Sequence, residues 1–374
     1  MKDVNLEELK LLIKLFSLFS GSPEERFQLQ ELYELEIAKR FLTCPYFEKR
    51  IKGMKEFKLI QEKVLNRTTR PPNDNNRPVR YEVAKHLDMA SFSAWIIKNK
   101  VIDFIFEENP HQELIKRSYS ILSLMAQDAQ TFPEEMVTLI WSCCSPEKHE
   151  DIVRATYELI TELAMCLPAE RLEGLFKRVR SIGLQSIDDK AVLFLRDYTI
   201  NTIENLKQVK RREAQRQTSG RQGASGGSSG GGIAQMFGRG SGSSQSKKGS
   251  VVSAGTGAGT QSQKSAALVD NERFFTPQVF WDIAQDENQH ATHRTKELAL
   301  SSLTEVLKTG HTFLPGIKEP FITQALDNVK NGRTTCLSIT FLQNVLGTFP
   351  HDDQLQAGGY GHSGYGGRSR GRNQ

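Results

Sequence analysis

Three histidines near residue 300 are the first candidates for metal chemistry. His290 and His293 have HxxH spacing, which places both rings on one face of a helix, and His311 follows further along the chain. A zinc site needs three or four protein ligands, and no third ligand stands at motif spacing from this pair. The polar residues 286–289 are typical of the start of a surface helix. We therefore expect solvated histidines, no metal site and no cofactor.

The cysteines indicate a compartment rather than a reaction. There are five of them, an odd number, and no two form a CxxC pair. Neighbouring residues such as Cys143 and Cys144 are poorly placed for a disulfide, and with Trp141 before them they are typical of a helical core. No secretory signal opens the chain. These features favour a reducing compartment, cytoplasmic and/or nuclear. The cysteines are Cys44, Cys143, Cys144, Cys166 and Cys336.

Cys336 has the neighbourhood that comes nearest to a catalytic one. The segment 331–337 (NGRTTCL) loosely resembles the Asn-x-Gly-x-Thr-Cys box of ubiquitin-specific cysteine proteases, in which the Cys attacks and the Asn side chain helps to stabilise the oxyanion. Here the Gly-to-Cys spacing is one residue too long, and no His box follows. Cys336 also falls on an amphipathic helix with Leu337 and Phe341. We therefore expect a buried structural cysteine.

The acidic pairs Glu134-Glu135 and Asp188-Asp189 stand near predicted helix starts. There they complement the helix dipole and need no catalytic interpretation. The chain contains no P-loop, no GxGxxG after a strand and no GxSxG. The sequence thus predicts no catalytic, cofactor-binding or metal-binding residue.

Hydrophobic residues at spacings of three and four predict helices through most of the chain, and no stretch has the alternation of a strand. Ser22-Pro23-Glu24-Glu25 is a capping box with Pro in the first turn. Starts near prolines 110, 133, 146 and 168 space helix pairs roughly 35–45 residues apart, as in armadillo and HEAT units. The predicted class is all-α, an armadillo/HEAT-like helical solenoid, with a compact helical bundle as the alternative. Expected helices cover 5–20, 24–43, 45–65, 81–99, 111–129, 133–144, 146–167, 168–180, 188–212, 277–285, 291–309, 319–330 and 333–349.

Two of these helices have a buried face that the sequence specifies. For the first helix we expect Leu6, Leu9, Leu12, Ile13 and Phe16 to pack in the core. For helix 81–99 the expected core face is formed by Val83, Leu87, Ala90, Ala94 and Ile97.

A Gly/Ser-rich tract divides the chain. Residues 1–206 are expected to form one helical-repeat block, 207–272 a disordered basic insert, 273–350 a helical-repeat block that continues the array, and 351–374 a disordered Gly/Tyr/Arg tail. We expect Leu206 and Phe275 to lie near each other.

The net charge of +5 hides an acidic body. Residues 207–269 hold ten basic side chains and one acidic one, a charge of +9, and three arginines of the tail add +3, which leaves −7 for the rest. The basic run 210–212 is typical of a solvated helix end or a nuclear-import signal. Tails that mix Tyr, Arg and Gly bind RNA weakly, so weak RNA contact through the tail is the alternative function. No apolar run is long enough to span a membrane.

Several segments together resemble the non-catalytic armadillo-like region of the large ubiquitin-specific proteases of the fat-facets type and their long paralogues. They are 41–54 (FLTCPYFEKRIKGM), 94–106 (AWIIKNKVIDFIF), 140–142 (IWS) and 279–287 (VFWDIAQDE). The resemblance spans roughly 41–349 without the tract. It implies a helical scaffold within, or derived from, a ubiquitin carboxyl-terminal hydrolase.

The function that the resemblance implies is binding of ubiquitin-pathway substrates or adaptors, in the service of protein deubiquitination. The family's catalytic Cys and His find no matching position here. Two hypotheses about this chain therefore remain. It is either a catalytically inactive relative of these proteases, or part of a cysteine-type deubiquitinase whose protease domain lies elsewhere.

Overall fold

The structure is a computed structural model that describes residues 6–19, 21–69, 84–108, 110–126, 130–184, 187–222, 275, 277–285, 287–311, 313 and 316–348. Within these ranges the chain forms fourteen α-helices, one π-helical segment and no strand, so the all-α prediction is confirmed. None of the described helices combines the length and the apolar character that crossing a bilayer requires.

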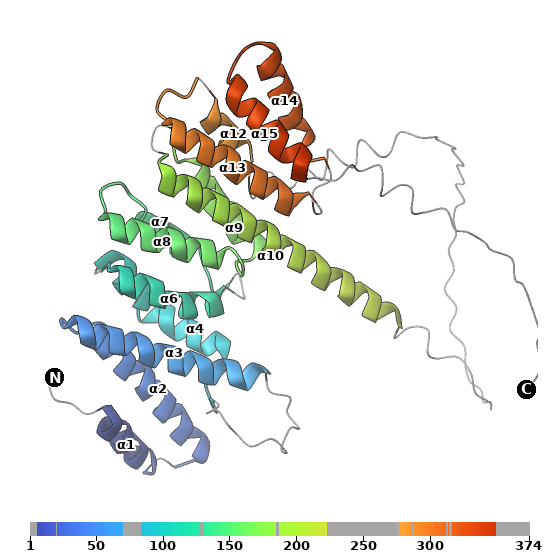
Figure 1. Ribbon diagram of the computed structural model, residues 1–374. Coiled ribbons are helices and arrows are strands. Elements are labelled where there is room, and N and C mark those ends of the chain that lie inside the picture. Colours follow the sequence, from blue (N-terminus) through green and yellow to red (C-terminus); the bar gives the residue numbers. More distant parts are fainter. Residues whose placement is uncertain are drawn as a thin grey trace, which may run out of the picture.

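Figure 1 shows the helices stacked one after another along the chain. Their order is α1 (Leu6–Ser17), α2 (Pro23–Leu42), α3 (Phe47–Thr69), α4 (Met89–Lys98), α5 (Val101–Asp103), η1 (Phe104–Glu108), α6 (Gln112–Met125), α7 (Glu134–Ser142), α8 (Glu150–Leu163), α9 (Ala169–Arg180), α10 (Asp189–Gln222), α12 (Gln278–Ala284), α13 (His293–Gly310), α14 (Glu319–Lys330) and α15 (Thr335–Thr348).

One layer of the stack is a ladder in which α3, α6, α8, α10, α13 and α15 succeed one another, each in contact with the next. The other helices pack beside it, for example α2 on α3, α12 on α13 and α14 on α15. One hydrophobic core runs from Leu35 to Val345. Because each helix buries its apolar face on its neighbours, stability comes from stacking. An extended stack of this kind excludes the alternative fold considered above, a compact helical bundle.

Side-chain contacts reveal the repeat length directly. Lys190 of α10 pairs with Glu150 of α8, 40 residues earlier, and the Asn201 side chain donates to the Thr161 carbonyl, again 40 residues earlier. In the other layer, Arg178 of α9 donates to Thr138 of α7 at the same separation. Equivalent positions therefore recur within the expected range of 35–45 residues.

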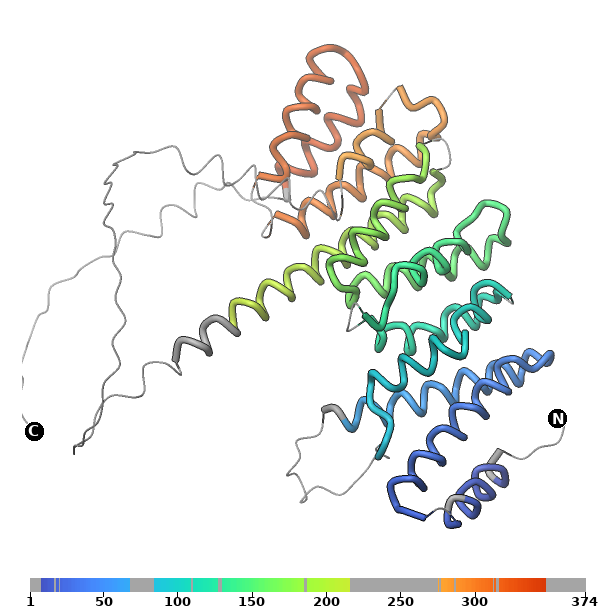
Figure 2. Tube along the Cα trace, turned by 180° about the vertical axis from the view of Figure 1, so that it is seen from behind, coloured from blue at the N-terminus to red at the C-terminus, as the bar shows by residue number. Residues whose placement is uncertain are grey.

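The two helical blocks form one array. The Thr295 hydroxyl at the start of α13 donates to Asp189 at the start of α10 over 2.7 Å, and Lys207 donates to the Thr309 carbonyl near the end of α13 over 2.7 Å. The two helices therefore run side by side in the same direction, as Figure 2 shows from behind. These contacts join α10 and α13 in one stack. Phe275 is buried in the shared core, and Leu206 packs against that core.

The expected start of the insert at residue 207 is wrong, as is the expected end of this helix at 212. The helix α10 continues to Gln222. Its continuation is anchored by Lys207 and by Lys210, whose ammonium lies 4.1 Å from the centre of the Phe313 ring. No Pro or Gly occurs from the start of α10 at residue 189 to residue 219, so nothing local stops the helix there. The remainder of the insert and the tail lie outside the described residues.

The helix expected at 81–99 begins only at Met89. The Glu31 carboxylate accepts hydrogen bonds from the backbone N–H groups of three successive residues, Lys85, His86 and Leu87, at 2.6, 3.0 and 2.6 Å. These bonds hold the segment before α4 out of helical conformation, and Asp88 caps the helix by accepting from Ser91.

The shortened α4 buries a different face from the expected one. Phe92, Ser93 and Ile96 are buried, while Ala90, Ala94 and Ile97 are exposed. Leu87 is buried ahead of the helix, and Val83 lies outside the described residues. The helix starts eight residues later than expected and is therefore short. Its larger apolar side chains, Phe92 and Ile96, determine which of its faces packs against the core.

The core prediction for α1 is only partly right. Ile13 is buried and Leu9 packs beside it against α2. Leu12 and Phe16 are instead 49% and 68% exposed, together with Leu15 and Phe19. The first helix packs mainly on α2, with an ion pair of 2.8 Å from Lys10 to Glu56 of α3, and these contacts leave its other side uncovered.

The predicted capping box at Ser22 is confirmed by both of its hydrogen bonds. The helix expected from Pro146 begins at Glu150 instead, because residues 145–148 form a turn and His149 caps α8 by accepting from Asp151.

Close contact between α2 and α3 depends on Gly53. A Cβ at this position would lie 2.6 Å from the Leu42 nitrogen and 2.7 Å from the Ala38 oxygen, both backbone atoms. We expect Gly53→Ala to lower the free energy of unfolding by about 1–3 kcal/mol, because the two helices must move apart.

Gly347 of α15 is the matched control, since a Cβ there meets nothing within 4 Å. Gly347→Ala should stabilise the protein by up to about 1 kcal/mol through helix propensity. Urea unfolding followed by circular dichroism measures both changes. A shift of the same sign in the two variants would contradict the packing argument.

Candidate functional site

The helices α8 and α10 form the walls of a groove. They are fixed to each other by the stacked rings of Tyr157 and Phe194, whose centres are 4.1 Å apart with planes 9° from parallel. Asn205 of α10 donates to the carbonyls of Ala164 and Leu167 at 2.8 and 2.9 Å, just past the end of α8. These contacts give the groove rigid helical walls.

The groove has a volume of about 980 Å³ and combines aromatic with charged side chains. Trp141 and Cys144 line it from the end of α7, and residues 181–183 line it from the turn after α9. Along α8 its lining residues fall at helical spacing, from Glu150 through Tyr157 to Glu162. A site of this size and mixed chemistry accommodates an extended peptide segment or a ligand of similar dimensions.

Most charged side chains of the groove are ion-paired. Five carboxylates and three cationic groups line it. At the end near the start of α8, Lys190 pairs with Glu150 and Arg154 with Asp151. At the opposite end, Lys116 pairs with Glu158 at 2.6 Å and Arg196 with Asp197 at 2.7 Å. Glu162 also lines this end.

Glu162 is the least compensated of the acidic groups. Its side chain is exposed; partial desolvation raises the pKa of its carboxyl, and the neighbouring Glu158 raises the pKa further, against an opposing effect of Lys116. Lys116 is held by Glu158 at 2.6 Å. Glu162 also lies in the last turn of α8, where the helix dipole disfavours an anion. Ionisation of Glu162 is therefore slightly unfavourable in the folded state, because solvent screens most of the effect at an exposed group.

Burial also raises the pKa of Tyr157 to about 12, with smaller contributions from Cys144 and Asp188. The phenol therefore stays protonated at neutral pH and keeps its hydrogen-bond donor.

The structure places the cysteines of this region as the sequence predicts. Cys143 is fully buried, and its thiol donates to the Phe106 carbonyl at 3.2 Å. Burial raises the pKa of both Cys143 and Cys144, so neither forms a thiolate readily.

The prediction that Cys336 is buried is wrong. It lies in the first turn of α15 and is exposed. The buried face of this helix is formed by Ser338, Phe341 and Val345, which leaves Cys336 on the solvent side. Among the described contacts no side chain acts as a base toward its thiol.

The three histidines lie on the surface, as expected, but the pair does not share a helix. His290 precedes α13, whereas His293 is its first residue and lies 3.5 Å from Glu297. Thr292 caps α13 and breaks the helical register that the HxxH spacing assumed. In the described part of the chain no three His, Cys, Asp or Glu side chains are grouped as metal ligands would be.

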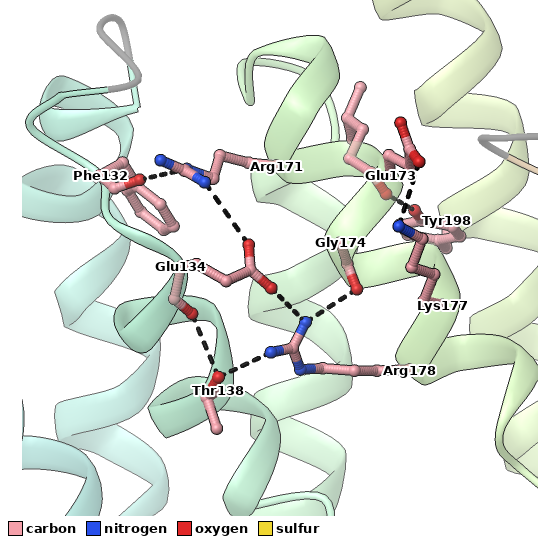
Figure 3. A network of polar contacts seen from close by, with 10 residues as sticks. Phe132, Glu134, Thr138, Arg171, Glu173, Gly174, Lys177, Arg178 and Tyr198 are labelled. Atoms are coloured by element: carbon pink, nitrogen blue, oxygen red, sulfur yellow. Dashed lines mark hydrogen bonds and ion pairs between the residues drawn. The ribbon is translucent and has the colours of Figure 1, made fainter.

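The acidic pairs do more than complement helix dipoles. Asp188 caps α10 by accepting from the Ala191 N–H at 2.8 Å. Glu134 links two repeats, because its carboxylate lies 2.5 Å from Arg178 and 3.6 Å from Arg171, both on α9 (Figure 3). Arg178 also donates to the Gly174 carbonyl at 2.8 Å, and Gly174 leaves room for the Glu134 carboxylate.

Sequence reasoning missed the α8–α10 groove because its two walls are separated by residues 164–188. The available signal was a set of polar and aromatic residues on the solvent side of two helices one repeat apart: Tyr157, Glu158 and Glu162 on the first, and Lys190 and Asp197 on the second.

Comparison with protein families gives a match that includes most of the residues lining the groove. Residues 28–194 match the model of the UBP24/USP9X/USP9Y ARM repeat. Residues 28–194 belong to this ARM repeat family. No match is found among curated proteins.

The family match confirms the resemblance and carries it further toward the N-terminus, to residue 28 in place of 41. It ends at Phe194 on the second wall of the groove. The part of the resemblance between 195 and 349 stays a prediction, although the same array continues structurally into that part. The chain therefore carries an ARM repeat region of USP9X/UBP24-type deubiquitinases.

The charge at Glu162 gives a testable effect on stability. Because its pKa is raised in the folded state, the ionised form is destabilising above that pKa, and the effect disappears once the carboxyl is protonated. Glu162→Gln should therefore raise the thermal unfolding midpoint at pH 7.5 and have little effect near pH 4.

The matched control is Glu135→Gln, since Glu135 is exposed in the first turn of α7, where the helix dipole favours an anion. Its midpoint at pH 7.5 should stay unchanged or fall. If Glu162→Gln lowers the midpoint at pH 7.5, the carboxylate is stabilising and the electrostatic account of the groove is wrong.

Proposed function

We propose that this ARM repeat region is a non-catalytic scaffold that serves protein deubiquitination by binding substrates or adaptors. The observation that supports this most is the family match, because residues 28–194 include the greater part of both walls of the groove. Armadillo units build extended surfaces of stacked helices that suit protein ligands.

The groove supports the proposal in physical terms. Its walls are held by a ring stack and by side-chain bonds to backbone carbonyls, so little ordering is needed when a ligand enters. Preorganised sites of this kind bind more tightly for a given contact area. The same proposal places the protein in the cytoplasm and/or nucleus. Its five cysteines are free, which supports a reducing compartment.

Selection from a displayed library of random peptides, with the full chain as bait, tests groove binding without assuming a partner. Leu193 of α10 lines the groove and is 37% exposed. We expect Leu193→Trp to fill the groove and weaken the selected peptides at least about tenfold, a change of about 1.4 kcal/mol in binding free energy.

Leu326→Trp is the matched control, since Leu326 is 55% exposed on α14, away from the groove. It should bind the selected peptides as the unsubstituted chain does. Equal loss in both variants, or no enriched peptide at all, would contradict the proposal.

A second prediction concerns turnover. The chain should not hydrolyse a fluorogenic ubiquitin substrate, and Cys336→Ala should give the same rate as the unsubstituted chain, because no base accompanies Cys336 in the described contacts. Turnover that Cys336→Ala abolishes would overturn the non-catalytic assignment.

A further inference from the structure

We propose that two copies of this chain associate through the exposed apolar face of α1, about a two-fold axis at this end of the array. The interface is separate from the proposed function, because none of its residues lines the α8–α10 groove. Three features of α1 support it: its residue pattern, the area that it leaves exposed, and its place in the stack.

Two rows of large apolar side chains run along the uncovered side of α1. Its other side packs against α2 through Leu9 and Ile13. The rows continue into the turn after the helix, where the N–H groups of Leu18 and Phe19 donate to carbonyls in the last turn of α1. The first row is Leu11, Leu15 and Leu18, the second is Leu12, Phe16 and Phe19, and these side chains are between 49% and 88% exposed.

The spacing of these rows indicates that the occupant is a helix. Within each row the residues follow one another at steps of four and three, the spacing at which apolar side chains of one helix interlock with those of another. A helix of a soluble protein normally turns such a stripe to the core and its polar residues to water. α1 instead presents the stripe to solvent.

The exposed area is large enough for a stable interface. Phe16 and Phe19 are 68% and 88% exposed, which leaves on the order of 300 Å² of these two residues in water, since an aromatic side chain buries about 150–250 Å². The four leucines about double that area. The patch is therefore larger than monomers normally expose, and it approaches the roughly 800 Å² that each partner contributes to a standard interface.

The place of α1 in the stack suits a second copy of the chain. α1 lies at one end of the described array, and α14 and α15 lie at the other (Figures 1 and 2). Two copies can therefore meet at α1 with their arrays directed away from each other. An apolar face of this kind is complementary to itself, as a two-fold interface requires.

The charges of α1 are compatible with this pairing. A two-fold axis across α1 sets its two copies antiparallel, so that Glu8 of one copy comes toward the Lys14 end of the other. Both side chains are exposed. Opposite charges that face each other across an interface favour the correct partner and orientation.

The opposite end of the array matches α1 poorly. Its exposed large apolar side chains, within the described residues, are Leu326 of α14 and Ile339 and Leu346 of α15. Gln343 is exposed between the last two, so no continuous apolar stripe forms there. Head-to-tail contact would also add copies without limit, whereas pairing through α1 closes after two.

Sedimentation velocity of the full chain, at about 1 to 100 μM, tests the inference. We expect a dimer whose share grows with concentration. Leu15→Glu/Phe16→Glu should raise the dissociation constant of the dimer at least about tenfold, because carboxylates would then be buried in the interface. Both residues are largely exposed in one copy, so the variant should fold, and circular dichroism verifies this.

Leu326→Glu/Leu346→Glu is the matched control, since these leucines are 55% and 65% exposed at the other end of the array. It should form dimers as the unsubstituted chain does. A chain that stays monomeric at the highest concentration overturns the inference and leaves the face to a helix of a different protein. Loss of association in the control, alone or together with the α1 variant, overturns it as well.

Cross-linking distinguishes two-fold pairing from association elsewhere, because in a two-fold interface a residue near the axis meets its own copy. Leu15→Cys, combined with Cys336→Ser to remove the exposed thiol, should give covalent dimers with a short bismaleimide. Leu326→Cys in the same background should not. The reverse result contradicts the inference, and the proposed binding of peptides in the groove would still stand.

Discussion

Stacking of each helix on the helix one repeat earlier is the constraint on which the rest of the structure depends. α10 occupies the centre of this arrangement, since it contacts α8 and α9 on one side and α13 on the other. Its buried side chains, including Val192, Leu195, Tyr198 and Ile203, join one core that extends through both blocks. Two helices held in this way leave a groove between their solvent sides, so the candidate site is a consequence of the stacking itself.

The groove shows how a scaffold can carry chemical specificity without a catalytic group. Ion pairs hold charged side chains at both of its ends, Lys190 with Glu150 at one and Lys116 with Glu158 at the other. Between them the groove combines these charges with the aromatic side chains of Trp141 and Tyr157. Mixed polar and aromatic linings of this kind are typical of binding sites.

The sequence predicts most of the fold, because helical periodicity and proline-marked starts are local signals. The capping box at Ser22 and the repeat length follow from such signals alone. The errors arise where a distant contact decides. Glu31 prevents the segment before α4 from becoming helical, and Lys207 and Lys210 extend α10 through contacts with residues about one hundred positions later. Cys336 is exposed because larger neighbours take the buried face of α15.

The candidate site is less accessible to sequence reasoning than the fold. Its residues look like the ordinary solvated faces of α8 and α10 until the 40-residue offset places them together. The family resemblance predicts a protein-binding scaffold, but the position of the groove and the pairing of its charges require side-chain contacts. Glu134 is a similar case, since its bridge to two arginines of α9 appears only in three dimensions.

Hydrogen exchange on an Ile203→Asp variant tests most directly whether the array is one stacked unit. Ile203 is fully buried in α10 and faces Gly310 of α13, so a carboxylate there should open this contact. The account predicts that α12, α13, α14 and α15 lose amide protection together with α10. Retention of full protection in these four helices while α10 exchanges freely would show that the second block folds by itself, and would contradict the account.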